Sequence, residues 1–428
     1  MKILDARSNM REALALGRRR GESDPAVDCR AREIIERVRT EGDEALTTLT
    51  RELDCRRIDA LGLRVSGREI ETSYARVGIP FIRALRFARE NIARFHRRQV
   101  LRPWELRGGG MRLRQQYRPL LRVGIYVPGG KAAYPSTVLM NAIPARIAGV
   151  EEIAMTTPCN GEGKIAPEVL VAAHECGIGE IYRVGGAQAI AALAYGTESI
   201  RPVEKITGPG NAYVAAAKRL VFGTVGIDMI AGPTEIVVVA DGTARPVLVA
   251  ADLIAQAEHD ESAAPILITT SRSLAREVAI EIDRQLETAP RKGIARRAFD
   301  GQGLIVLVRS LADAAEIVNM IAPEHLELMV QNPRKSLARI RNAGSVFLGT
   351  WATEALGDYV AGVNHTLPTS GSARFSSPLG VADFMKFMNV IEVSRGAFRR
   401  LAPAAETLAG VEGLAGHAAS LRIRRELT

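Results

Sequence analysis

Between residues 121 and 240, short β-branched runs alternate with alanine-rich stretches, and this alternation constrains the fold more than any other feature. The apolar runs have the length of strands and are rich in Val and Ile, as in "VGIYVP" and "EIVVVA". The stretches between them, such as "STVLMNAIPARIAGV" and "AQAIAALAYG", have the length and composition of helices. This alternation predicts a parallel sheet with helices on its faces.

The alternation resumes downstream, where "APILITT" and "LIVLV" are typical of strands and helices are expected near 273–287 and 311–321. Residues 24–100 have the apolar spacing of successive amphipathic helices, and three glycines at 108–110 interrupt that pattern. After Pro378 we expect the chain to be helical again. We therefore predict an α/β fold with two parallel-sheet units, a helical N-terminal region and a helical C-terminal tail.

Charge and composition exclude several classes of protein. The formal net charge of +9 comes from the N-terminal third, which could indicate nucleic-acid binding. However, acids alternate with the arginines in segments such as "REIIERVRTEGDEAL", which is typical of solvated helix faces. We expect no nucleic-acid partner, no membrane segment and no signal peptide. The four cysteines form no Cys-x-x-Cys pair, so we expect reduced thiols and a cytoplasmic protein.

Glycine-rich turns follow three of the predicted strands, at residues 128–130, 185–186 and 208–210. No string satisfies the dinucleotide fingerprint in its proper context: residues 208–213 lack the third small residue, and residues 161–166 lie in a polar loop. Each turn taken alone could be a tight strand–helix connection. Three such turns in one α/β unit favour a ligand that carries phosphate.

Candidate metal ligands lie in the C-terminal half. Gln256 and His259 are three residues apart on a predicted helix, so their side chains share a face. Asp358 follows a glycine in a turn-like context, and His417 lies in the tail. Amide, imidazole and carboxylate donors suit zinc or manganese. The alternative is surface histidines beside capping acids, and the spacing alone cannot bring these residues together.

Glu324 and His325 are adjacent in "IAPEHLEL" and could place two proton-transfer groups where a loop enters a helix. Imidazole is the natural base at neutral pH, and a carboxylate can activate water. A helix-capping acid beside a half-buried histidine explains the pair equally well.

Many segments between about residues 120 and 418 resemble segments of the histidinol dehydrogenase family, and they occur in the same order along the chain. They are VGIYVPGGKAAYPSTVLMNAIPARIAGV, VGGAQAIAALAYGTESI, ITGPGNAYVAAAKR, IDMIAGPTEI, DLIAQAEHD, APEHLEL, GSVFLG, GDYVAGVNHTLPT and EGLAGHA. The resemblance implies a zinc-dependent enzyme that oxidises L-histidinol to L-histidine through a bound aldehyde with two NAD, the last step of histidine biosynthesis. It also implies incomplete Rossmann-like units, consistent with the missing fingerprint.

The resemblance assigns roles to individual residues. The zinc ligands would be Gln256, His259, Asp358 and His417. The acid–base pair would be Glu324 and His325, and NAD would contact Tyr126, Gln188 and Asn211. Substrate would be held by Thr234, His365 and Glu412 together with His325 and the metal ligands. Thr234 departs from the family, which commonly has serine there; the hydroxyl is kept, but the extra methyl could narrow the pocket.

The resemblance also implies a homodimer in which the tail crosses to the partner, so that Glu412 and His417 complete the other subunit's site. The expected organisation is an N-terminal arm (1–22), a metal-side α/β domain (23–122 with 232–378), an NAD-side α/β domain (123–231) and the swapped tail (379–428). The alternative is a zinc and NAD dehydrogenase of the same family acting on another small polar alcohol, such as a sulfonated propanediol. A carboxylate at position 412 argues against it, since it suits a cationic amine. A catalytically inactive structural dimer is disfavoured by the intact set of acid, base and ligands.

Overall fold

A computed structural model describes residues 1–16, 24–129 and 132–427. The chain forms two compact units, residues 1–99 with 121–384 and residues 100–120 with 385–428. Within the described ranges, no helix is long and apolar enough to cross a membrane. The first unit contains two parallel sheets, so the predicted α/β fold with parallel-rich sheets is confirmed.

The first sheet comes from the region of alternating strands and helices. Its five strands lie in the order β6-β5-β4-β7-β8, and all neighbours are parallel. Their bounds are β4 Arg122–Tyr126, β5 Glu152–Thr156, β6 Glu180–Tyr182, β7 Lys205–Thr207 and β8 Gly226–Ile227. The intervening helices are α7 Pro135–Ala148, α8 Pro167–Glu175, α9 Gly186–Tyr195 and α10 Ala212–Val221. Because the chain leaves β4 for β5 on one side and later returns to β7 on the other, the strand order reverses at β4, where open sheets bind ligands.

The second sheet has six parallel strands in the order β1-β11-β10-β9-β12-β13. The strands are β1 Lys2–Asp5, β9 Glu235–Ala240, β10 Ala264–Thr269, β11 Leu304–Leu307, β12 His325–Met329 and β13 Ser345–Leu348. The helices are α11 Pro246–Ala257, α12 Arg272–Leu286, α13 Lys292–Gly301, α14 Leu311–Ile321, α15 Pro333–Leu337 and α16 Glu354–Tyr359. Strands β9 and β10 are buried along nearly their whole length, as expected when helices cover both faces of a sheet.

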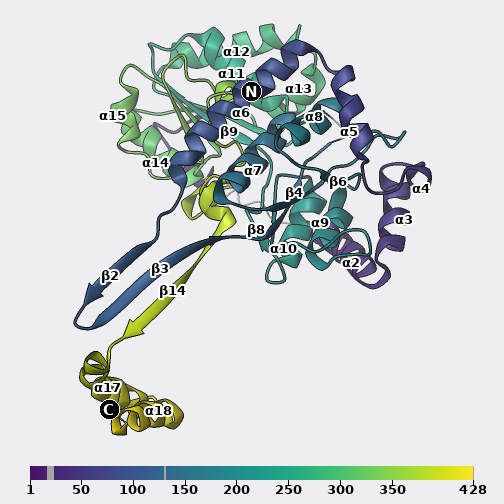
Figure 1. Cartoon of the computed structure of the whole chain (residues 1–428). Helices are drawn as coiled ribbons and strands as arrows, with labels where there is room; N and C mark the ends of the chain where they lie inside the picture. The colour runs from purple at the N-terminus through teal and green to yellow at the C-terminus, as the bar shows by residue number, and fades with distance from the viewer. Residues whose placement is uncertain (17–23, 130–131, 428) are drawn as a thin grey trace. The chain divides into compact units, whose positions relative to one another are not determined.

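The predicted N-terminal helices are confirmed. They are α1 Met10–Ala15, α2 Pro25–Glu41, α3 Asp43–Leu53, α4 Ile58–Leu61, α5 Gly67–Ser73 and α6 Ile79–His96. Helix α2 packs on α9 and α10 beside the five-stranded sheet (Figure 1), and its buried side chains join the apolar core of that sheet. Short 3-10 turns are η2 Tyr74–Arg76, η3 Arg97–Gln99, η4 Ser372–Arg374 and η5 Val381–Phe384.

The second unit is an antiparallel sheet of order β14-β3-β2 with two helices. Its elements are β2 Trp104–Gly108, β3 Met111–Pro119, β14 Met385–Val393, α17 Arg395–Val411 and α18 Ala415–Glu426. The expectation of helix directly after Pro378 is wrong, because β14 comes first. Its polar residues Lys386, Asn389 and Glu392 recur every third position, a spacing that imitates an amphipathic helix.

Candidate functional site

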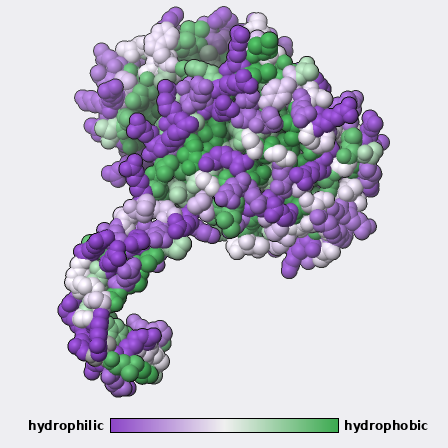
Figure 2. Space-filling view, viewed as in Figure 1, coloured by the Kyte–Doolittle hydropathy of each residue, from purple (hydrophilic) through white to green (hydrophobic). Residues whose placement is uncertain are grey.

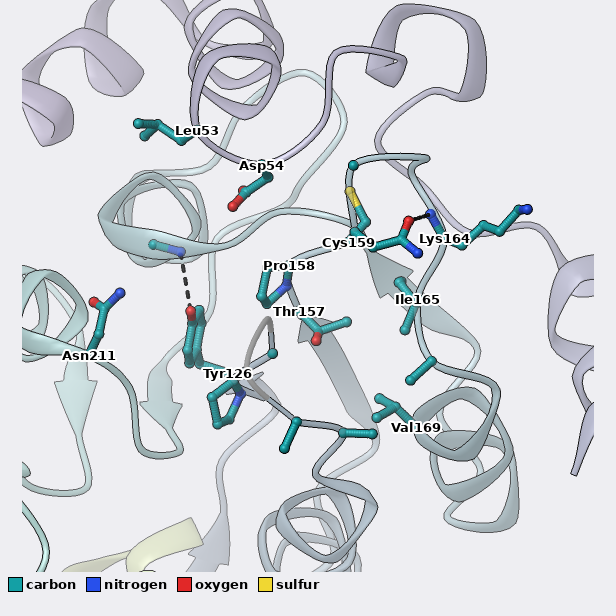
Figure 3. Close-up of a pocket in the computed structure, with 18 of the residues that line it drawn as sticks. Leu53, Asp54, Tyr126, Thr157, Pro158, Cys159, Lys164, Ile165, Val169 and Asn211 are labelled. Carbon is teal, nitrogen blue, oxygen red and sulfur yellow. Dashed lines mark hydrogen bonds between the residues drawn. The ribbon is translucent and has the colours of Figure 1, made fainter. Parts of the chain in front are cut away.

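A cavity of about 1060 Å³ lies at the carboxyl edge of the five-stranded sheet, where the strand order reverses (Figure 3). Tyr126 at the end of β4, Gln188 on α9 and Asn211 before α10 all line it. The structure thus brings together the three side chains that the resemblance assigns to NAD. Cofactor pockets commonly measure about 300–1,000 Å³, so the cavity is large enough for a dinucleotide.

The polar atoms of these three residues are only partly used by the protein. The Tyr126 hydroxyl accepts a hydrogen bond from the Gly186 N–H at 3.2 Å, and burial raises its pKa to about 12. Asn211 Oδ1 caps α10 by accepting from the Val214 N–H at 3.1 Å, which leaves its amide nitrogen for a ligand. Among the described residues, the buried Gln188 Oε1 has no hydrogen-bond partner.

The turn after β7 is held by a buried ion pair. Gly208 has a φ of 111°, and a Cβ there would lie 2.0 Å from the Tyr126 carbonyl oxygen, so only glycine fits. Lys218 Nζ donates to the Gly208 carbonyl at 3.0 Å and forms an ion pair with Asp228. Asp228 Oδ2 in turn accepts from the Gly208 N–H at 2.8 Å. The backbone next to Asn211 is therefore fixed before any ligand binds.

The polar loop that follows β5 lines the same cavity. Gly161, Lys164 and Ala166 are among its lining residues, although the G-x-G-x-x-A string in this loop lacked the usual context of a dinucleotide fingerprint. The glycine turns contribute Gly129 and Gly186; Gly130 lies outside the described residues. The ligand-binding edge is thus formed by several strand–helix turns rather than by one fingerprint loop.

A second set of functional residues lies at the amino edge of the six-stranded sheet. Thr234 directly precedes β9 and Glu324 directly precedes β12, and these strands are paired in register with His325 opposite Ile236. Glu324 Oε2 accepts from Thr234 Oγ1 at 2.6 Å and from the Glu235 N–H at 3.0 Å. The expected loop-to-helix entry is therefore wrong: the pair stands where a loop enters a buried parallel strand.

Carboxylates surround His325 on several sides. His325 Nδ1 lies 3.8 Å from Glu354 Oε1 and 3.8 Å from Glu324 Oε2, and Nε2 lies 3.6 Å from Asp358 Oδ1. Burial lowers the pKa of His325, but these carboxylates, Glu354 first, raise it well above its usual value. Burial raises the pKa of Glu324, which the His325 charge and the two hydrogen-bond donors oppose. The two side chains are thus electrostatically coupled and almost completely buried.

Gln256 and His259 come from the end of α11, at the same edge of the sheet. Gln256 lies in the last turn of α11, whereas His259 lies two residues beyond the final helical residue, Ala257. The expectation that one helix face presents both side chains is therefore wrong. His259 lies in a turn that follows the helix, in which its N–H donates to the Gln256 carbonyl at 3.3 Å.

The Gln256 amide has two possible orientations, and each has a different consequence. With its nitrogen toward Thr234, Gln256 donates to Thr234 Oγ1, and the single Thr234 hydroxyl proton goes to Glu324. The amide oxygen then faces only acceptors, the Glu354 carboxylate and His325 Nδ1. With the amide reversed, nitrogen donates to Glu354 Oε1 and Oε2 at 2.9 and 2.8 Å. The first orientation requires a cation or a proton beside the oxygen.

Within the described part of the chain, three residues of this site are placed so that they could hold a metal ion. Ligand atoms of His259, Glu354 and Asp358 all lie within 4.8 Å of one another. Asp358 was expected in a turn, but it lies on the short helix α16. Glu354 was missed by the sequence analysis, although it lies four residues before Asp358 and therefore on the same helix face, a spacing that could have identified it.

More buried carboxyl groups lie behind these ligand candidates. Burial raises the pKa of Glu354 to about 8, and burial together with Asp252 raises that of Glu327 to about 9. Glu327 Oε1 accepts from the Glu354 N–H at 2.9 Å, and Asp252 Oδ1 accepts from Thr353 Oγ1 at 2.9 Å. So many acidic groups in a small volume cannot all ionise unless positive charge compensates them.

His365 belongs to the same site, whereas the two tail residues lie in the second unit. His365 Nδ1 is 3.0 Å from the Asp358 carbonyl oxygen, and Nε2 is 3.5 Å from Thr137 Oγ1. Glu412 directly follows α17 and His417 lies on α18, so neither is among the residues that the first unit gathers at the site.

Comparisons with known proteins identify the family to which the chain belongs. The family model for histidinol dehydrogenase matches residues 17–425. A histidinol dehydrogenase of Moorella thermoacetica is 53% identical over 401 residues, 94% of this chain and 95% of the relative. One from Geobacter metallireducens is 50% identical over 428 residues, 99% of this chain and 98% of the relative. The crystal structure of histidinol dehydrogenase from Elizabethkingia anophelis has a TM-score of 0.93 at 36% identity, covering 99% of this chain and 97% of that one. The chain therefore belongs to the histidinol dehydrogenase family and is an oxidoreductase of histidine biosynthesis.

Proposed function

We propose that the protein catalyses the zinc-dependent, four-electron oxidation of L-histidinol to L-histidine through L-histidinaldehyde, with reduction of two NAD. One observation supports this proposal above all others: a buried acid–base pair, Glu324 and His325, lies against a cluster of nitrogen and oxygen donors. The names of the relatives favour histidinol and give no support to the sulfonated alternative.

The donor set fits a zinc ion. We propose Gln256, His259, Asp358 and His417 as its ligands, the last from the tail of a partner subunit. The three ligand atoms grouped around His259 are the observation that favours a cation here, and a cation would also suit the orientation of Gln256 in which its amide oxygen faces acceptors. Imidazole, carboxylate and amide donors without thiolate suit a catalytic rather than a structural zinc. When bound, the ion would orient the substrate and offset the negative charge of the cluster.

NAD would bind in the cavity of the five-stranded sheet. Tyr126, Gln188 and Asn211 line it, and two of them present polar atoms that the protein leaves available. The turn at Gly208, where only glycine fits against the Tyr126 backbone, fixes the chain that leads into Asn211.

The acid–base pair would act in both halves of the reaction. His325 would accept the alcohol proton as hydride leaves for NAD. Glu324, whose Oε2 already binds two donors, would then activate a water that adds to the aldehyde, and the resulting hydrate would be the species that loses the second hydride, with NAD as its acceptor. Thr234, His365 and Glu412 would hold the substrate. Thr234 also fixes the orientation of Glu324 through its hydroxyl.

We propose a cytoplasmic homodimer in which Glu412 and His417 complete the partner's site. The second unit has many exposed apolar side chains, visible as green surface on its helices in Figure 2. Leu408, Val411, Ile423 and Leu427 are between 58% and 83% exposed. A small unit with so much exposed apolar surface is typical of a partner interface.

The proposal is tested by counting NADH formed per L-histidinol consumed, before and after chelation and zinc return. We expect two NADH per substrate, loss on chelation and recovery with zinc. The Glu324→Gln variant separates the two halves: oxidation of histidinol to the aldehyde should fall less than about tenfold, whereas oxidation of supplied aldehyde should fall by about 100-fold or more. One NADH per substrate, or equal loss of both halves, would contradict the proposed roles.

A further inference from the structure

Asp54 lies in the wall of the dinucleotide cavity but comes from the helical N-terminal region. It directly follows α3, and its carboxylate points toward the cavity between Tyr126 and Pro158 (Figure 3). The Gly185 N–H faces this carboxylate, and a Cβ at Gly185 would lie 3.1 Å from Asp54 Oδ2. The acid that a dinucleotide site normally has after a strand was not found in the sequence, and Asp54 occupies an equivalent place from another element.

One oxygen of this carboxylate lacks a hydrogen-bond donor. Among the described residues, Asp54 Oδ2 is buried without a partner. Burial raises the pKa of Asp54, and the Gly185 N–H only partly opposes this. A buried acceptor without a donor has lost its water and gained nothing in return, so a ligand that supplies hydroxyl donors gains affinity by satisfying it. Ribose hydroxyls are such donors, and carboxylates bind them in other dinucleotide sites.

The position of α3 indicates which ribose is involved. Figure 1 shows α2, α3 and α4 beside α9 and α10, well apart from β9 and α11 of the six-stranded sheet. The nicotinamide must reach Glu324 and His325 at that second sheet, so the adenosine end of the cofactor extends toward α3. Leu53, next to Asp54 in the chain, supplies apolar wall near the carboxylate, and Ile165 and Val169 line the other side of the same cavity (Figure 3).

We propose that Asp54 accepts hydrogen bonds from the adenosine ribose hydroxyls of NAD and that its negative charge excludes the 2′-phosphate of NADP. The inference rests on the proposed use of NAD. Three cations line the same cavity, Arg30, Arg76 and Lys164, and none of them is among the groups that shift the pKa of Asp54. Arg30 pairs with Glu33 at 3.0 Å, and Lys164 pairs with Glu162 at 2.7 Å.

The Asp54→Asn variant tests the proposal, because asparagine keeps the size and one acceptor for the Gly185 N–H while removing the charge. We expect the KM for NAD to rise about tenfold or more, kcat to change less than about twofold, and the preference for NAD over NADP to fall about tenfold or more. The matched control is Asp59→Asn, which removes an exposed carboxylate that binds Arg51 at 2.8 Å outside the cavity. The control should change none of these values, and thermal unfolding of both variants reports on folding.

The wild-type protein offers a test that does not depend on any variant. Calorimetry without substrate should show that 2′-deoxy-NAD binds at least about tenfold more weakly than NAD, and Asp54→Asn should reduce this difference to less than about threefold. Equal binding of the two cofactors by the wild type, or an unchanged NADP preference in a folded Asp54→Asn variant, overturns the proposal. If the wild type shows these binding preferences but forms no NADH from histidinol, the proposed function fails and the role of Asp54 stands.

Discussion

The two parallel sheets present their functional residues at opposite edges. In the five-stranded sheet, Tyr126 is the last residue of β4 and the Gly208 turn follows the carboxyl end of β7. In the six-stranded sheet, Thr234 and Glu324 precede the amino ends of β9 and β12. The first location is usual for a ligand in an open α/β sheet, and the second is not. One site is therefore shaped by strand–helix turns and the other by side chains that converge where strands begin.

The two sites also differ in how buried charge is compensated. Lys218 in the first is matched by Asp228 and also donates to the Gly208 carbonyl. In the second, Glu235, Glu324 and Glu354 are buried acids whose pKa values are all raised. The turn beside the cofactor cavity has its buried charges paired without a ligand, whereas the other side needs protons or a cation. Neutralising one buried charge should therefore have opposite effects at the two sites.

The largest effect is expected for Lys218→Met. Removing one partner of a buried ion pair leaves an uncompensated charge and should reduce the free energy of unfolding by about 3–5 kcal/mol. The Gly208 turn loses its support at the same time, so NAD binding should weaken as well. Urea unfolding and NADH fluorescence titration measure the two effects.

Lys164→Met is the matched control for the unfolding measurement. Lys164 forms an exposed ion pair with Glu162 at 2.7 Å, which should contribute less than about 1 kcal/mol. If Lys218→Met were no less stable than Lys164→Met, the buried pair would not hold the turn.

The sequence predicted the sheets well because buried parallel strands are continuous apolar runs. The runs at 235–240 and 264–269 became β9 and β10 for this reason. The second unit was predicted poorly, because its strands are largely exposed and carry no apolar run. In β3, "MRLRQQYRP" alternates polar and apolar residues without a buried face, and in β14 the polar spacing imitates a helix.

The opposite effect is expected at Glu235, which lies beside Glu324. Burial raises its pKa from 4.5 to about 7, against the lowering by the N–H groups of Ser370 and Gly371. The folded state therefore holds the proton more tightly than the unfolded state, and stability should fall as the pH rises from about 4.5 through about 7. Glu235→Gln removes this loss, so the variant should match the wild type at pH 5 and be more stable by about 2 kcal/mol at pH 8.5.

Urea unfolding at pH 5, 7 and 8.5 measures this difference. Glu162→Gln, an exposed acid paired with Lys164, is the control and should show no such increase with pH. A Glu235→Gln variant that is less stable than the wild type at pH 8.5 would mean that this carboxylate is compensated in the folded protein.

The candidate site could be predicted only in parts. Pairs that are adjacent or share one helix, such as Glu324 with His325, are visible in the sequence. The convergence of Thr234, Gln256 and Glu324 is not, because it depends on the in-register pairing of β9 with β12 and on where α11 ends. Asp54 was missed for a similar reason, since it reaches the cavity from a helix rather than from a strand end.

The smallest effect is expected for Thr234→Ser. Thr234 lies between the side-chain amide of Gln256 and the carboxylate of Glu324. Serine keeps the hydroxyl that donates to Glu324 Oε2 at 2.6 Å and accepts from Gln256, so the orientation of Glu324 should survive. Loss of one methyl group should cost less than about 1 kcal/mol of stability. If the methyl narrows the substrate pocket, the KM for histidinol should fall by up to about threefold with kcat unchanged.

Steady-state kinetics measure KM and kcat separately, and Thr234→Val, which keeps the shape but lacks the hydroxyl, is the control. Thr234→Val should reduce kcat strongly because both Gln256 and Glu324 lose a partner. Equal kinetics for the two variants would show that the Thr234 hydroxyl does not connect Gln256 to Glu324. The orientation of Glu324 would then be set without this hydroxyl.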